Sequence, residues 1–204
     1  MRPIAGLLIA YLAGSIPFAF LAGKLFKGID LRQHGSGNLG ATNVFRVMGW
    51  KIASVVMILD MAKGALPVLL LPPRFAPSSP ELWAIAFGVA AIVGHVRSVF
   101  LLWKGGGKGV ATAGGVFLAL APIPSVISIA VWGVVLYISG FVSLASLTSS
   151  VALVAAVFVR YGARSPIAIA SAVICLFVFW THRANIARLH RGEENRFRRA
   201  RPAH

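Results

Sequence analysis

The chain has 204 residues, of which 58% are hydrophobic and only 12% are charged, about half the charged fraction of soluble globular domains. This composition excludes an ordinary soluble protein, and the length allows about five to seven membrane spans of roughly 20 residues each. The formal net charge of +15 could indicate nucleic-acid binding, but the cations lie between and after apolar stretches, which is typical of membrane topology. We therefore expect one membrane-embedded domain, residues 1–204, and no nucleic-acid partner.

Seven apolar stretches alternate with polar connections along the chain. In order, they are Ile4–Gly23, Ile52–Leu71, Leu82–Trp103, Val110–Ala121, Ile123–Ile138, Val142–Val159 and Ile167–Trp180. The fourth stretch is too short for a full crossing at about 1.5 Å per residue, and Pro122 and Pro124 follow it. The sequence therefore predicts an all-α integral membrane protein with about seven transmembrane helices, the alternative being five helices and a re-entrant segment.

The distribution of cations predicts which connections face the cytoplasm. Lysine and arginine concentrate in residues 24–51 and in the basic tail, residues 182–204, whereas the connection around Arg74 is poor in them. The positive-inside rule then places the amino terminus outside and the carboxyl terminus in the cytoplasm. With seven spans, the glycine-rich connection that begins at Lys104 and the turn around Ser139–Ser143 face the same side, so one site could use all the polar clusters.

The first polar cluster, residues 34–46, reads HGSGNLGATNVFR. Its glycines allow positive φ and close backbone approach, so successive amide N–H groups can converge on an anion while serine and asparagine add donors. The glycines also match GxGxxG, but no strand precedes them, which excludes a dinucleotide site. A tight interfacial loop that caps the next helix is the structural alternative. The predicted phosphate-binding residues of this cluster are Gly37, Asn38, Gly40, Thr42 and Asn43.

The second cluster, residues 104–112, reads KGGGKGVAT and lies between two apolar stretches. Glycine at this density destabilises a helix, a cost that makes sense if the loop wraps closely around a phosphate. Lys108 would supply a point charge, and the following helix its amino-terminal dipole. The spacing is not that of a Walker loop, and a flexible hinge with snorkelling lysines is the alternative. The predicted phosphate-binding residues here are Lys104, Gly106, Gly107, Lys108 and Gly109.

The third cluster begins where the last apolar stretch ends, at Thr181. A histidine at this membrane edge, His182, can titrate near neutral pH. If the helix continues, His182 and Asn185 are three residues apart and point into the same pocket. The arginines from Arg196 to Arg201 are better explained by adhesion to anionic lipid.

Polar residues also occur within the predicted spans. The segment Gly140–Ser150 carries several serines, including Ser143 and Ser146, which taken alone are more typical of helix packing. Asp60 lies well inside the second span with Lys63 one turn further on. Ions inside a membrane are functional candidates by default, but an internal Asp60–Lys63 pair is the simpler explanation.

Carboxylates are few on the predicted cytoplasmic face, where only Asp30, Glu193 and Glu194 occur. Membrane phosphotransferases usually hold magnesium with several clustered acids, whereas acyl transfer to a hydroxyl requires only anion binding and proton handling. We therefore expect neither a metal site nor any other cofactor.

The motifs HGSGNLGATNVFR, GGGKGVAT and THRANIARLHRGEE, in this order among apolar spans, resemble the bacterial acyl-phosphate:glycerol-3-phosphate acyltransferase family over nearly the whole chain. The resemblance implies transfer of a fatty acyl group from acyl-phosphate, not acyl-CoA, to the sn-1 hydroxyl of glycerol 3-phosphate. The products are lysophosphatidic acid and phosphate, in the first acylation step of bacterial phospholipid synthesis. It also implies a multi-pass protein of the cell inner membrane with its site facing the cytoplasm. The expected partners are acyl-phosphate, glycerol 3-phosphate and membrane lipids, and we expect a monomer.

The resemblance also implies roles for individual residues. By position, the catalytic residues are Ser36, Arg46, His182 and Asn185. Lys108 and its neighbouring glycines match the family's phosphate loop, and Ser143 and Ser146 resemble polar, substrate-binding positions of a fourth segment. The acid of the last motif falls on Glu193 or Glu194, with Glu194 preferred, and it is expected to be structural, like Asp60 and Lys63.

A mechanism consistent with these parts is direct attack of the glycerol hydroxyl on the acyl carbonyl, while cations and glycine amides neutralise the phosphates. The base is either His182 or an oxygen of the acyl-phosphate, and an acyl-Ser36 intermediate is less favoured because no triad-like spacing is evident. A transporter of phosphorylated anions is the main alternative, but transporters place their sites near the midplane and often contain repeats. A membrane scaffold would not need the glycine and asparagine clusters.

Overall fold

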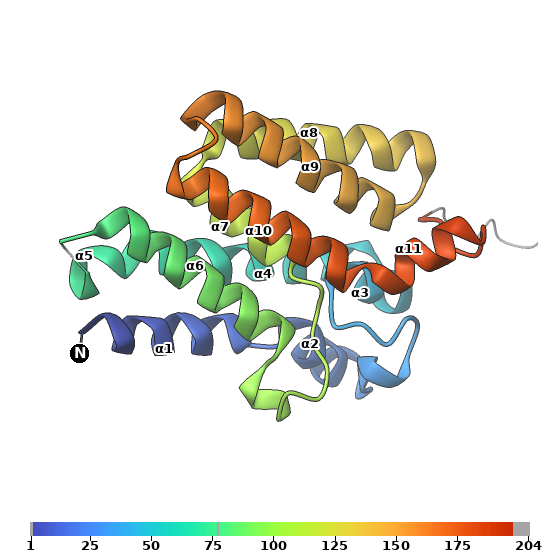
Figure 1. Ribbon diagram of the computed structural model, residues 1–204. Coiled ribbons are helices and arrows are strands. Elements are labelled where there is room, and N and C mark those ends of the chain that lie inside the picture. The colour runs from blue at the N-terminus through green and yellow to red at the C-terminus, as the bar shows by residue number, and fades with distance from the viewer. Residues whose placement is uncertain (1, 77, 198–204) are drawn as a thin grey trace, which may run out of the picture. The chain divides into compact units, whose positions relative to one another are not determined.

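The computed structural model describes residues 2–76 and 78–197, and all of its regular elements are helices, which confirms the predicted all-α architecture (Figure 1). It consists of two compact units, Met1–Pro122 and Ile123–His204, which are described separately below. The end of the predicted basic tail, including Arg201, lies outside the described residues. The single membrane domain expected for residues 1–204 stays a prediction, since two compact units can share one membrane domain.

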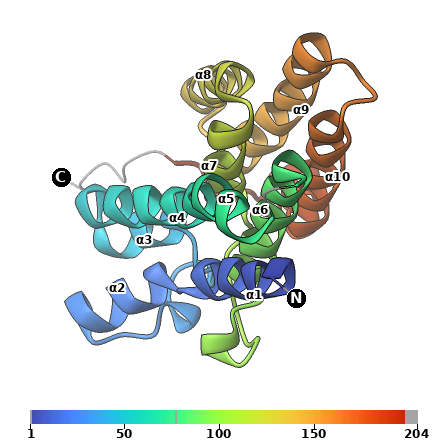
Figure 2. The ribbon, with the colours of Figure 1, turned by 90° about the vertical axis from the view of Figure 1, so that its left-hand side faces the viewer.

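The first unit contains seven α-helices and two short 3-10 helices. They are α1 (Arg2–Ser15), α2 (Phe18–Lys27), η1 (Leu31–Gln33), α3 (Ala41–Met48), α4 (Trp50–Leu70), α5 (Pro72–Phe75), α6 (Pro80–Val96), η2 (Val99–Leu101) and α7 (Val110–Leu120). Helix α1 packs along α6, and α4 packs along α7 and α3, as both views of the ribbon show (Figures 1 and 2). The two polar clusters predicted in this unit form the connections before α3 and before α7.

Glycines let these helix pairs approach to backbone contact. A Cβ at Gly14 of α1 would collide with the backbone of Ala91 in α6, and a Cβ at Gly115 of α7 would collide with the Met61 carbonyl of α4. Lipid is as apolar as the side chains, so helices in a membrane associate through close packing of small residues. The apolar runs of this unit therefore form closely packed helix pairs.

The first apolar stretch, predicted over Ile4–Gly23, lies within one candidate span, Arg2–Lys27, which consists of two helices. Helix α1 ends at Ser15 and α2 begins at Phe18, because Pro17 has no N–H for the helical ladder. Side chains from elsewhere in the unit satisfy the carbonyls freed at the break. Ser98 Oγ donates to the Ser15 carbonyl at 2.6 Å, and Lys63 Nζ donates to the Ile16 carbonyl at 2.7 Å.

The third apolar stretch, predicted over Leu82–Trp103, is helical only to Val96 before the short η2. Leu102 and Trp103 then adopt positive φ angles of 50° and 57°. This tight turn leads into the glycine loop, residues 104–109, which precedes α7.

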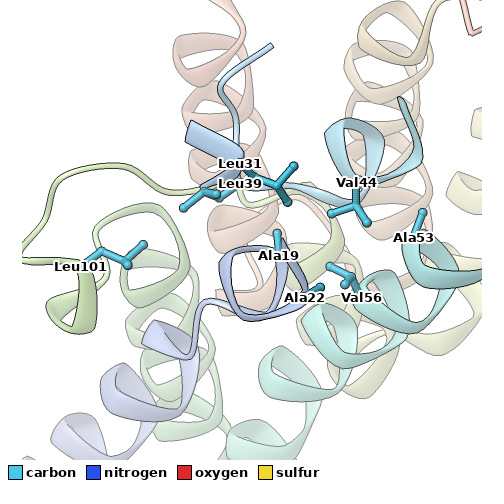
Figure 3. Close-up of a cluster of buried hydrophobic side chains, with 8 residues drawn as sticks. All are labelled: Ala19, Ala22, Leu31, Leu39, Val44, Ala53, Val56 and Leu101. Atoms are coloured by element: carbon cyan, nitrogen blue, oxygen red, sulfur yellow. The ribbon is translucent and has the colours of Figure 1, made fainter. Parts of the chain in front are cut away.

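A cluster of buried apolar side chains holds the first polar loop, residues 31–40 before α3, against the helices (Figure 3). Its members come from α2, α3, α4, the loop and η2: Ala19, Ala22, Leu31, Leu39, Val44, Ala53, Val56 and Leu101. Leu31 and Leu39 lie at either end of the polar segment and are 0% and 4% exposed. The loop is therefore anchored by apolar burial at both ends while its polar middle stays at the surface.

The second unit contains α8 (Pro122–Ser139, which begins at the boundary), α9 (Val142–Tyr161), α10 (Pro166–Thr181) and α11 (Arg183–His190). Helices α9 and α10 pack along each other. Trp132 Nε1 of α8 donates to Ser146 Oγ of α9 at 3.3 Å. Helices α10 and α11 meet at an angle of 60°, so the last apolar helix bends sharply where the third polar cluster begins.

Five segments of the described chain are long and apolar enough to cross a membrane, and the number is six if the bent pair α10–α11 counts as one span. The five are Arg2–Lys27, Trp50–Phe75, Pro80–Leu101, Pro122–Ser139 and Val142–Tyr161. Helix α7 has only 11 residues, so a count of seven would require this short helix to cross as well. The count of seven and the outside amino terminus therefore stay predictions.

The adjacent glycines of α7 provide a matched test of the close packing with α4. Gly115→Ala places a methyl group on the Met61 backbone and is expected to destabilise the protein by about 1–3 kcal/mol. Gly114→Ala adds a methyl where nothing lies within 4 Å and improves helix propensity, so it should be neutral or stabilising by about 0.5–1 kcal/mol. Thermal unfolding in detergent measures both. Equal melting temperatures for the two variants would contradict the close α4–α7 contact.

Candidate functional site

The loop of the first polar cluster is organised around the side chain of Asn43, which is 1% exposed. Its Oδ1 accepts a hydrogen bond from the Ser36 amide at 2.8 Å, and its Nδ2 donates to the carbonyls of His34 and Leu31 at 3.0 and 3.3 Å. Gly35 has a positive φ of 61°, and a Cβ there would collide with Asn43 Oδ1. Asn43 therefore holds the loop in shape, and its predicted phosphate contact stays a prediction.

The two predicted catalytic residues of this cluster are both exposed. Ser36 is fixed through its backbone N–H, which leaves its hydroxyl at the surface of the loop. Arg46 lies one turn after Asn43 on α3 and is also exposed. Helix α3 begins directly after Gly40, so the partial positive charge of its amino-terminal amides adds to this surface, where Thr42 is half-buried.

The structure brings the first and second polar clusters together. The Gly106 carbonyl accepts from the Leu39 amide at 3.3 Å and from Asn38 Nδ2 at 3.5 Å, and the Lys104 carbonyl accepts from Arg32 Nη1 at 3.0 Å. Three hydrogen bonds thus join the two loops, which are about 70 residues apart in sequence. The combined surface contains glycine amides, hydroxyls and the cations of Lys104 and Lys108.

Arg32 is fixed in this bridging position by Asp30. The Arg32 guanidinium donates from Nε and Nη2 to the Asp30 carboxylate at 2.6–3.1 Å, which makes a bidentate ion pair. These hydrogen bonds lower the pKa of Asp30 to about 2 and raise the pKa of Arg32. Both groups therefore stay charged at neutral pH, and Arg32 directs its remaining nitrogen to the glycine loop.

Beneath the glycine loop lie three buried ionisable residues, Asp60, Lys63 and His95. Lys63 Nζ is 2.7 Å from Asp60 Oδ1, the ion pair that the sequence suggested, and His95 Nδ1 is 3.5 Å from the same oxygen. Asp60 and Lys63 are 1% and 5% exposed. The pair lies on one face of α4, one turn apart, and His95 comes from the last turn of α6.

The second unit brings together residues of the third and fourth predicted clusters. Glu194 accepts hydrogen bonds from Asn185 Nδ2 at 2.6 Å, from Arg188 Nε at 2.7 Å and from Ser143 Oγ at 2.9 Å. Burial of the Glu194 carboxyl by itself raises its pKa, but these hydrogen bonds outweigh burial and hold the pKa below its usual range. The ionised Glu194 therefore fixes the segment directly after α11 to α9 and α11.

Ser146, which was predicted to contact substrate like Ser143, has different surroundings. Its hydroxyl donates to the Val142 carbonyl of its own helix at 2.8 Å and accepts from Trp132 Nε1. These are bonds of helix packing, the alternative that the sequence left open. Its substrate contact stays a prediction.

His182 occupies the bend between α10 and α11 and is 3% exposed. Its Nδ1 lies 2.8 Å from the Val178 carbonyl, which can only accept. This contact assigns the proton of a neutral imidazole to Nδ1 and leaves a lone pair on Nε2. Asn185 is also buried, one turn further on, so the bend buries both residues of the predicted pair.

Sequence reasoning singled out neither Arg32 nor His95. Arg32 follows Asp30 by two residues at the edge of the first motif, and this short charged pair was a visible signal. His95 is the only ionisable residue in the apolar run from Leu82 to Val96, and an ionisable group at membrane depth is itself a signal. Within residues 2–76 and 78–197, no three His, Cys, Asp or Glu side chains gather as metal ligands would.

Comparison with known proteins gives one consistent family. The family described as glycerol-3-phosphate acyltransferase matches residues 4–192. The glycerol-3-phosphate acyltransferase of Anaeromyxobacter sp. (strain K) is 44% identical over 95% of this chain and 97% of its own. That of Geobacillus kaustophilus (strain HTA426) is 47% identical over 90% of each chain.

Two solved structures match as well. Both are of PlsY (YgiH), described as an integral membrane glycerol 3-phosphate acyltransferase. Its glycerol 3-phosphate form has a TM-score of 0.89 and 38% identity, covering 97% of this chain and 96% of that one. Its lysophosphatidic acid form has a TM-score of 0.85, covering 96% and 95%.

These matches and the long apolar helices together show that the protein is a multi-pass membrane protein. The resemblance carried by the three polar motifs is confirmed over almost the whole sequence. The chain belongs to the glycerol-3-phosphate acyltransferase family.

Proposed function

We propose that this protein transfers a fatty acyl group from an acyl-phosphate to the sn-1 hydroxyl of glycerol 3-phosphate. The observation that carries the proposal is the joining of the two phosphate-type loops by hydrogen bonds to Gly106 and Lys104. Relatives named for this acylation support the acceptor, as do solved relatives in glycerol 3-phosphate and lysophosphatidic acid forms. The acyl-phosphate donor rests on the resemblance of the polar motifs.

In the proposed reaction, the glycerol hydroxyl oxygen bonds to the acyl carbonyl carbon, and the bond from that carbon to the phosphate oxygen breaks. Both substrates carry phosphate, so the site must neutralise anions more than it must activate a leaving group. Lys104, Lys108 and Arg46 supply the positive charge, and the glycine amides supply fixed donors. The exposed hydroxyl of Ser36 donates a hydrogen bond to a substrate phosphate.

The hydroxyl proton goes either to His182 or to an oxygen of the acyl-phosphate. The contact of His182 Nδ1 with the Val178 carbonyl leaves Nε2 able to accept a proton, which supports the first choice. Phosphate is a good leaving group that needs no strong acid catalysis, which supports the acyl-phosphate oxygen as the base. Asn185, held by Glu194, is proposed to help position the substrates.

The proposed chemistry needs no metal. The chain has five carboxylates, and four of them are paired with cations of the protein. Asp30 pairs with Arg32, Asp60 with Lys63, Glu193 with Arg191 and Glu194 with Arg188. We further propose that the site faces the cytoplasm from the inner membrane, where the cation-rich connections would lie.

A defined assay with purified protein in detergent tests the donor and the absence of a metal. With palmitoyl-phosphate, glycerol 3-phosphate and excess EDTA, we expect both phosphate and lysophosphatidic acid to form, whereas palmitoyl-CoA should give no product. Product from palmitoyl-CoA would contradict the donor, and loss of turnover with EDTA would contradict the metal-free mechanism. If neither donor reacts with well-folded protein, transport of a phosphate ester becomes the better hypothesis.

Ser36→Ala and Arg46→Ala test the first loop. Each is expected to lower kcat by about 100-fold or more, because it removes a donor or charge facing the phosphates. The Ser36 backbone bond to Asn43 survives the change, so the melting temperature should stay near that of the wild type. Arg160→Ala at the end of α9 is a control that removes an equal charge. Wild-type kinetics in either loop variant would remove this loop from the site.

Lys108→Ala tests the second loop. Loss of a point charge to a phosphate is expected to raise the KM for glycerol 3-phosphate about 10- to 100-fold with a smaller effect on kcat. Lys51→Ala, at the start of α4, removes the same charge elsewhere in the first unit and should change the KM little. Steady-state kinetics at saturating acyl-phosphate separate the two parameters. A fall in kcat at unchanged KM would mean that Lys108 does not bind the acceptor.

A further inference from the structure

Three ionisable side chains below the glycine loop have no part in the proposed chemistry. Asp60, Lys63 and His95 are 1%, 5% and 7% exposed and lie on α4 and α6, within segments long enough to span a membrane. Removing two charges from water carries a large desolvation cost, and apolar residues of similar size often pack as well as a buried ion pair. Helix packing alone therefore does not explain why charges occupy these positions.

The group is held by charge contacts and by one bond to backbone, while the buried Asp60 Oδ1 accepts no hydrogen bond within the described residues. Lys63 Nζ donates to the Ile16 carbonyl at the break between α1 and α2, lies 2.7 Å from Asp60 Oδ1, and sits 5.4 Å from the Phe18 ring centre. His95 Nδ1 approaches the same carboxylate oxygen at 3.5 Å. The carboxylate thus lies between a fixed ammonium and the imidazole, in a position to orient that ring.

The other side of the imidazole supports the glycine loop. A Cβ at Gly107 would collide with His95 Nε2, and a Cβ at Gly106 would collide with the carbonyls of Val96 and His95. The Gly107 amide also donates to the His95 carbonyl at 3.4 Å. From the opposite side, the first polar loop holds the Gly106 carbonyl through the Leu39 amide. The loop is therefore held between the first polar loop and His95.

The space between these groups is too small for a substrate. A cavity of about 10 Å³ is lined by Asp60, Lys63, His95 and the two glycines, with room for nothing larger than a water molecule. The backbone of the loop therefore separates the three side chains from any ligand bound on its outer side.

We propose that Asp60, Lys63 and His95 are positioning residues for the glycine loop. Lys63 fixes Asp60, Asp60 orients the imidazole of His95, and the imidazole sets the path of the backbone at Gly106 and Gly107. The identity of the ligand, glycerol 3-phosphate, rests on the proposed function, whereas the support of the loop does not.

Hydrogen exchange of the substrate-free protein tests the support directly. His95→Leu removes the oriented ring, and Asp60→Asn with Lys63→Met removes the orienting carboxylate without leaving an unpaired charge. Each is expected to speed amide exchange in residues 104–109 about tenfold, because the loop loses a fixed neighbour. Exchange in α9 and α10 should not change. The control Ser171→Ala removes a buried hydroxyl that bonds only within α10 and should leave the loop unaffected.

Kinetics of the same variants give a second readout. The KM for glycerol 3-phosphate is expected to rise about tenfold with kcat changed less than about threefold, and the combined triple variant should be no worse than the worse of the two. Unchanged loop exchange, or exchange that rises equally throughout α1 and α6, would mean that the group only stabilises the fold and would overturn the proposal. If the wild type does not acylate glycerol 3-phosphate, the proposed function fails, and hydrogen exchange still decides the positioning role.

Discussion

The constraint on which this structure depends is that backbone groups released from a helix near the membrane must find a partner within the protein. The break at Pro17 frees carbonyls at the end of α1 and in the break itself, and Ser98 and Lys63 satisfy those of Ser15 and Ile16. The first polar loop solves the same problem with Asn43, whose carboxamide satisfies three backbone groups. Asn43, Ser98 and Lys63 are thus committed to irregular backbone, which separates them from polar residues such as Ser36 that stay at the surface.

This division separates two kinds of residue that look alike in the sequence. Asn43 and Ser36 belong to one motif, yet the first is buried in the loop and the second presents its hydroxyl outward. Ser143 and Ser146 are one turn apart on α9, yet the first binds the ionised Glu194 and the second only its own helix and Trp132. Motif membership therefore does not fix a residue's task, because the geometry of the loop or helix face decides which groups are already bound.

The helices could be predicted because composition alone forces them: a long apolar stretch in lipid has to bond its own backbone. The break at Pro17 and the turn at Leu102 were missed because apolar composition continues through them. The role of His95 was also out of reach, since it depends on contact with Gly107 and Asp60 from another helix and loop. Sequence patterns report local periodicity and chemistry, whereas these features are set by contacts between distant segments.

A loop of glycines gives close backbone approach to an anion, but it has no side chains with which to hold its own shape, and ordering it costs more entropy than ordering other residues. Its conformation must therefore be imposed from outside. Arg32 and Leu39 do this from the first polar loop, and the Asp30 carboxylate keeps Arg32 in place. His95 restricts the same backbone through its close contact with Gly107. The glycine loop keeps one conformation because the first polar loop and His95 of α6 contact its backbone from two sides.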